Sequence, residues 1–247
     1  MKLKKIASLM LAGVMAVSML AGCSGNTIND NTGDDDSIDP GINGVSAAVG
    51  ALVKEELGDD YPAYVTFSDS AELNKDLQYA VEYAGVMDIM PNYIWSDTLT
   101  GVANDVYSRL QTAVGDDAND GVDVGNIGSD AILKAAENTG MTMEDAVAVD
   151  MRAISSSIGE NALNQLIAEK INEIVKIEDY LYSTQDGDDN NGSNYNHTYT
   201  VSVSTYTKTV NSSMNGSLTS GTGNVQGAAD PAVTFVAIQV VRTSTHQ

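Results

Sequence analysis

The stretch AVTFVAIQVVR, residues 232–242, is the strongest indication of the fold. An extended strand with this sequence has no polar face, because apolar residues stand at both its odd and its even positions. The two faces are Val233, Phe235 and Ala237 on one side, and Ala232, Thr234, Val236, Ile238 and Val240 on the other. A strand that is apolar on both faces belongs inside a sheet that helices cover. The sequence therefore predicts a layered domain.

A second strand is predicted just upstream, in HTYTVSVSTYTKTV (197–210). Its polar and apolar residues alternate with period two, which places Tyr199, Val201 and Val203 on one face. We expect the two strands to pair antiparallel across the Gly-, Ser- and Asn-rich segment 211–231. The stretch YPAYVTF (61–67) is a third candidate strand, and its Pro62 suits a strand start or a sheet edge.

Apolar residues at helical spacing fill most of the chain before these strands. We predict helices over 45–57, 71–84, about 96–114, about 129–138, 142–157 and 160–182. Asp69 or Ser70 is expected to cap the second helix, and Thr142 to Asp145 resembles a capping box before the fifth. In the last helix Asn164 is expected to face solvent. The prediction is one α+β domain, residues 45–247, with about six amphipathic helices followed by a small C-terminal antiparallel sheet.

The first 22 residues are predicted to lie outside this domain. Lys2, Lys4 and Lys5 form a positive segment, and an uncharged run of small and apolar residues follows from Ile6 to Leu20. This is the layout of a secretory signal peptide. The run is too short for a comfortable membrane span.

The residues that follow the run define the type of signal. Leu20-Ala21-Gly22-Cys23 resembles the lipobox of bacterial lipoprotein precursors in all four positions. The resemblance covers about the first 25 residues. It implies that a diacylglyceryl group is attached to the Cys23 sulfur and that a signal peptidase cuts between Gly22 and Cys23. Two acyl chains on one residue make a durable membrane anchor.

Residues 23–44 are predicted to form an acidic, flexible tether. They consist mostly of Gly, Asn, Asp, Ser and Thr, and include Asp34, Asp35, Asp36 and Asp39. Loss of the signal peptide removes three lysines and no acid, so the net charge of −22 becomes −25. A domain this acidic is repelled by anionic lipid, so the lipid on Cys23 must hold it at the membrane alone.

Composition excludes several classes of function. A net charge of −22 argues against a nucleic-acid partner, since phosphates would be repelled. The single cysteine excludes an internal disulfide and a four-cysteine zinc site. Only two histidines exist, His197 and His246, and neither completes a Ser-His-Asp or Cys-His set. We assign no catalytic residue and no metal ligand from the sequence.

Calcium remains an open alternative at one loop. Asp116, Asp117, Asn119, Asp120 and Asp123 alternate with small residues, and oxygen ligands are what calcium requires. The stretch 117–134 resembles half of a dockerin or EF-hand repeat, but its ligand spacing departs from that pattern by one residue. The loop around Asp186, Asp188, Asp189 and Asn190 is a weaker match.

Aromatic residues concentrate between positions 61 and 95, where they either pack the core or form a binding surface for a peptide or glycan. They are Tyr61, Tyr64, Phe67, Tyr79, Tyr83, Tyr93 and Trp95. We expect a lipid-anchored protein of the cell membrane that faces the extracellular or periplasmic side. Its domain is expected to be a non-enzymatic module that binds an extracellular ligand or protein. The alternative is an envelope hydrolase that uses carboxylates on a glycan or peptidoglycan.

Overall fold

The computed structural model divides the chain into residues 1–38 and 39–247, and all the residues it describes belong to the second unit. The described residues are 44–84, 96–118, 122, 124–127, 145–177, 181, 183–185, 195–209 and 232–246. The predicted signal peptide, Cys23 and residues 23–43 of the tether therefore lie outside them.

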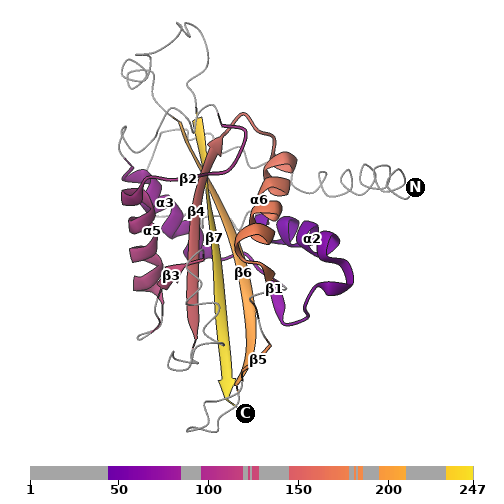
Figure 1. Ribbon diagram of the computed structural model, residues 1–247. Helices are drawn as coiled ribbons and strands as arrows, with labels where there is room; N and C mark the ends of the chain where they lie inside the picture. Colours follow the sequence, from indigo (N-terminus) through magenta and orange to yellow (C-terminus); the bar gives the residue numbers. More distant parts are fainter. Residues whose placement is uncertain are drawn as a thin grey trace, which may run out of the picture. The chain divides into compact units, whose positions relative to one another are not determined.

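Three long strands form the middle of the domain: β4 (Ala146–Ser155), β6 (Tyr195–Thr209) and β7 (Ala232–His246). Strand β7 lies between the other two and pairs antiparallel with both, so that Val240 stands opposite Ala148 and Val201. The central position and the antiparallel pairing expected for residues 232–242 are confirmed (Figure 1).

Four short strands extend the sheet at its two sides. The order of the strands across the sheet is β1-β6-β7-β4-β2, and β3 and β5 pair off this path. β1 (Val65–Phe67) and β5 (Thr184–Gln185) pair with β6, while β2 (Thr100–Gly101) and β3 (Val124–Asn126) pair with β4. The β1–β6 and β3–β4 pairs are parallel, so the sheet is mixed. The predicted third strand is confirmed but is shorter than the stretch 61–67.

Helices cover both faces of the sheet (Figure 1). On one face lie α2 (Val45–Leu57) and α6 (Glu160–Ile174), and on the other lie α3 (Ala71–Glu82) and α5 (Asn104–Asp117). A short 3₁₀ helix, η1 (Gly58–Asp60), follows α2. The result is three layers, helix, sheet and helix.

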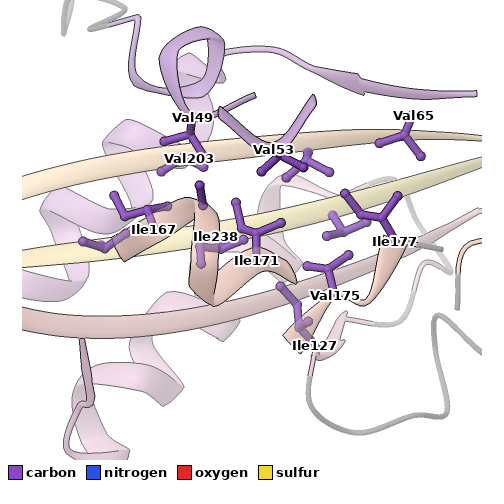
Figure 2. Packing of buried hydrophobic residues seen from close by; sticks show 14 of the residues in the cluster. Val49, Val53, Val65, Ile127, Ile167, Ile171, Val175, Ile177, Val203 and Ile238 are labelled. Atoms are coloured by element: carbon purple, nitrogen blue, oxygen red, sulfur yellow. The ribbon is translucent and has the colours of Figure 1, made fainter. Parts of the chain in front are cut away.

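Each face of β7 belongs to a separate hydrophobic core. Val236 and Ile238 pack with α2 and α6, whereas Phe235 and Ala237 pack with α3 and α5. Figure 2 shows the first core, with Val49, Val53, Ile167, Ile171 and Ile238 among its labelled side chains. Full burial of an aliphatic side chain of this size contributes about 1.5–3 kcal/mol.

The helix predicted over 142–157 is wrong, because residues 146–155 form strand β4. Nine of its ten residues are buried and apolar residues stand at both its odd and its even positions, so periodicity alone does not separate such a strand from a buried helix. Residues 142–144 lie outside the described part. The Asp145 carboxylate accepts a hydrogen bond from the Ser244 amide at 2.8 Å, a contact across the sheet.

The prediction of about six helices followed by a small C-terminal sheet is also wrong. The described residues contain four α-helices, and their seven-stranded sheet takes strands from along the whole domain. The helix expected from residue 96 begins only at Asn104, because Thr100 and Gly101 pair with β4. The helix expected to end at 182 ends at Ile174, and Asn164 in it is buried. The helix predicted at 129–138 lies outside the described residues. The class, α+β, stands.

The cap expected for residues 71–84 is confirmed at Ser70, whose hydroxyl accepts the Leu73 amide hydrogen bond at 3.1 Å. The neighbouring Asp69 acts on another helix, because its carboxylate accepts the amide of Ser46 at 3.0 Å, in the first turn of α2. A carboxylate at a helix N-terminus is favourable for both hydrogen bonding and the helix dipole. One dipeptide therefore caps two helices that lie on opposite faces of the sheet.

Gly50 allows α2 to lie close to Phe67. A Cβ at this position would stand 2.5 and 2.6 Å from two carbon atoms of the Phe67 side chain. We expect Gly50→Ala to destabilise the fold by about 1–3 kcal/mol, although alanine favours a helix by about 1 kcal/mol. Urea unfolding measures the change. In a Phe67→Gly background, which lacks both of the close carbon atoms, the same substitution should be neutral or stabilising, and a loss that persists there would disprove the steric cause.

Candidate functional site

The Asp-rich loop proposed for calcium is only partly within the described residues. Asp116 and Asp117 form the end of helix α5, whereas Asn119, Asp120 and Asp123 lie outside the described part, as do Asp186, Asp188, Asp189 and Asn190. Among the described side chains no three His, Cys, Asp or Glu residues gather as metal ligands do. Calcium at this loop therefore stays a prediction.

The structure pairs Asp117 with a residue to which the sequence assigned no role. Asp76 of α3 is 5% exposed and forms a side-chain hydrogen bond with Asp117. Burial, and then the charge of Asp117, raise the pKa of Asp76 to about 6. Both causes favour the protonated form of Asp76, because burial and a neighbouring negative charge disfavour its ionisation. Lys75, whose ammonium lies 3.9 Å from Asp117, partly offsets the shift.

A signal for Asp76 exists in the sequence. It stands three residues after Leu73 and four before Ala80, on the apolar face of the predicted helix. A carboxylate at such a position must be paired or protonated when it is buried. The partner comes from α5, and the spacing of residues within one helix does not identify a partner in another.

A second polar cluster lies where the end of β7 pairs with the start of β6. His197 is 2% exposed, and its Nδ1 lies 2.9 Å from the Ser244 hydroxyl oxygen. Arg242, also 2% exposed, is close enough that its charge acts on the histidine. Ser244 in turn donates its amide to Asp145. Serine, histidine and aspartate thus meet at one end of the sheet, a juxtaposition that the sequence did not predict.

This cluster does not have the order of a catalytic triad. The aspartate contacts the serine amide, whereas a triad requires it to orient the imidazole. Burial and the positive charge of Arg242 lower the pKa of His197 to about 4, too low for a general base near neutral pH. The arrangement therefore holds strand ends together. The other histidine, His246, is the last residue of β7.

The aromatic residues of 61–95 divide into two groups. Tyr61, Tyr64 and Phe67 pack against the core under α2 and α6, as the core interpretation predicted. Tyr79 of α3 and Tyr83 at the C-cap of that helix are 50% and 64% exposed, and their ring centroids lie 5.0 Å apart at 57°. Tyr93 and Trp95 lie outside the described residues. The binding-surface interpretation therefore concerns the Tyr79–Tyr83 pair.

Comparison with family models, with curated proteins and with solved structures finds no match to this chain. In the part of the chain that the structure describes, no helix is both long and apolar enough to cross a membrane.

Asp76 gives the fold a dependence on pH that can be measured. Its pKa is about 6 when folded and about 3.8 when unfolded, so the protonated carboxyl stabilises the fold at low pH and this contribution is lost as pH rises through 6. We expect Asp76→Asn, which keeps the contact with Asp117, to be more stable than the wild type at pH 7.5 by about 2–3 kcal/mol.

Urea unfolding of both proteins at pH 4 and pH 7.5 measures this difference, and the gain should vanish at pH 4. His197 acts in the opposite direction, because its pKa is lowered and its contribution is lost as pH falls from 6.5 towards 4. The variant should therefore lose stability on acidification more steeply than the wild type. Equal pH profiles for the two proteins would refute the raised pKa of Asp76.

Proposed function

We propose that the chain is a lipoprotein anchored through Cys23, and that its acidic α+β domain is a non-enzymatic module that binds an extracellular ligand or protein. The observation that carries the anchor is Leu20-Ala21-Gly22-Cys23 directly after an uncharged apolar run. The tether of residues 23–44 gives the domain a reach of roughly 25 Å from the bilayer.

The binding part of the proposal rests on the Tyr79–Tyr83 pair. Large apolar side chains in a packed domain are normally buried, yet these two rings are half or more exposed and pack on each other. Tyrosine presents a rigid, amphipathic area at low entropic cost, which is why it is enriched in binding surfaces. Glu72, Lys75 and Glu82 are the other exposed residues of α3.

The alternative, an envelope hydrolase, has one observation in its favour, the Asp76–Asp117 pair. A carboxyl with a pKa of about 6 is suited to general acid work. The geometry fits a glycosidase poorly, however, because the two carboxyl groups of such an enzyme are about 5–9.5 Å apart and these two are in hydrogen-bond contact. Peptidoglycan cleavage that Asp76→Asn abolishes would favour the hydrolase.

The anchor is tested with Cys23→Ala. Without the thiol there is no site for the diacylglyceryl group, so the protein should move from the membrane fraction to the soluble or secreted fraction and lose labelling by a fatty-acid analogue. Cys23→Ser, which keeps the size but not the thiol, serves as the matched control and should behave alike. Unchanged membrane retention of either variant would contradict the anchor.

The binding surface is tested with Tyr79→Ala/Tyr83→Ala. Both rings are exposed, so the double variant should unfold within about 0.5–1 kcal/mol of the wild type. Wild type and variant are compared on printed arrays of glycans and of peptides. We expect ligands that the wild type binds and the variant does not, whereas Gln78→Ala on the same helix should bind as the wild type does. Identical binding patterns for all three proteins would contradict the proposal that Tyr79 and Tyr83 form a binding surface.

A further inference from the structure

Strand β6 has an outer edge, opposite β7, that is covered over only part of its length. Strand β5 pairs with residues 195–196 and β1 with residues 199–201. On this edge the amide of Tyr199 donates to Tyr64, and the carbonyl of Val201 accepts from the Ser68 amide at 3.1 Å. Up to Val201 the outer edge is therefore closed by main-chain hydrogen bonds.

At Val203 a side chain replaces a neighbouring strand. The Ser46 hydroxyl donates to the Val203 carbonyl at 3.2 Å and accepts the Val203 amide at 2.9 Å. Ser46 is fully buried, and its own amide is held by Asp69. One hydroxyl group thus satisfies both main-chain groups of Val203, and helix α2 begins at this point.

Beyond Val203 none of the described strands pairs with this edge. Residues 199, 201 and 203 direct their main-chain groups away from β7, and this alternation places those of Thr205, Thr207 and Thr209 on the same edge. Within the described residues no strand pairs with β6 here, and Thr207 and Thr209 are exposed. Three amides and three carbonyls thus form a template about 13 Å long, since a strand rises about 3.3 Å per residue.

A lysine at a sheet edge normally discourages pairing with another strand. Lys208 does not act in this way, because its ammonium turns towards α3 and donates to the carbonyls of Val81, Glu82 and Ala84 at 2.9, 3.2 and 2.9 Å. It caps the C-terminus of the helix and leaves the edge of Thr205 to Thr209 without a projecting charge.

Two occupants of this edge are considered, a second copy of the chain and an extended peptide. The net charge of the protein favours the peptide. Two copies would each carry a net charge of −22, so that their association is opposed by repulsion. The Glu82 carboxylate lies close enough to β6 for its charge to act on Tyr206. An acidic protein with a carboxylate beside this edge favours a strand that carries lysine or arginine.

We propose that residues 205–209 of β6 form a docking edge that takes up an extended, basic peptide segment of a partner protein as an additional strand. The main chain of the segment would pair with Thr205, Thr207 and Thr209, and its cationic side chains would face the acidic domain. This inference goes beyond the proposed function, because the edge is separate from Tyr79 and Tyr83 and does not depend on the lipid anchor.

The probe is a fluorescein-labelled heptapeptide of alternating lysine and valine, blocked at both ends, titrated into the whole protein at 150 mM salt and followed by fluorescence anisotropy. Saturable binding is expected. N-methylation of alternate residues removes the donors that face β6, and should weaken binding about tenfold or more. Replacing lysine by glutamate should weaken it as well. Equal binding of the N-methylated peptide would overturn the proposal, because general charge attraction alone would then explain it.

Two variants of the protein test the same edge. Thr207→Pro removes an amide that the ladder with β7 does not use, so the fold should survive while the peptide binds at least about tenfold more weakly. Thr207→Val, which also loses the hydroxyl contact with Thr234, is the matched control and should bind within about twofold of the wild type.

Far-UV circular dichroism checks that the proline variant folds. If it does not fold, the comparison of the unmodified and the N-methylated peptide on the wild type still tests the docking edge. Full binding by a folded Thr207→Pro variant would refute the docking edge. The proposal would also be refuted if the free wild-type protein sedimented as a dimer and the Thr207→Pro variant as a monomer, since the occupant of the edge would then be a second copy. Tyr79→Ala/Tyr83→Ala should bind the peptide normally, so failure at the edge is distinguishable from failure of the tyrosine surface.

Discussion

The remaining elements of the domain are organised around the burial of β7 on both faces and both edges. Its two faces need two separate helical layers, and its two edges need β4 and β6. The residues between the two helical layers, Val233 to Ile238, are apolar except Thr234, and the polar residues of the strand gather towards its C-terminal end, from Arg242 to His246. The short strands, the helix pairs and the caps are arranged around that single element.

The sequence reveals this centre because β-branched and aromatic residues occupy both parities of 232–242. The same property conceals β4: residues 146–155 also have apolar side chains at both parities, but alanine and methionine favour a helix as well, and a capping-box pattern precedes them. Pairing with β7 makes these residues a strand rather than a helix, and no local sequence pattern indicates that pairing. The short strands β2 and β3 are missed for a related reason, since two or three residues carry no periodicity.

The candidate sites also differ in whether local sequence or tertiary packing determines them. Tyr79 lies on α3 away from the stripe of Leu73, Leu77 and Ala80, so its exposure is readable from helical spacing, whereas Tyr83 follows the helix as its C-cap and spacing alone does not place it. The contacts between Asp76 and Asp117, and between His197 and Ser244, join residues 41 and 47 positions apart in the sequence. They depend on how helices and strands pack, and a sequence without a matching family gives no indication of which polar residues will meet.

The position of β7 in the chain has a consequence for how the domain reaches its native state. The strand at the centre of the sheet follows every other described element in the sequence, and β1 must wait for a partner more than 130 residues further on. Contacts of such long range close slowly, and the two long strands β4 and β6 lack their common neighbour until residues 232–246 are present. During synthesis, which begins at the N-terminus, the central strand is therefore the last to become available, and the domain would fold cooperatively in one late step.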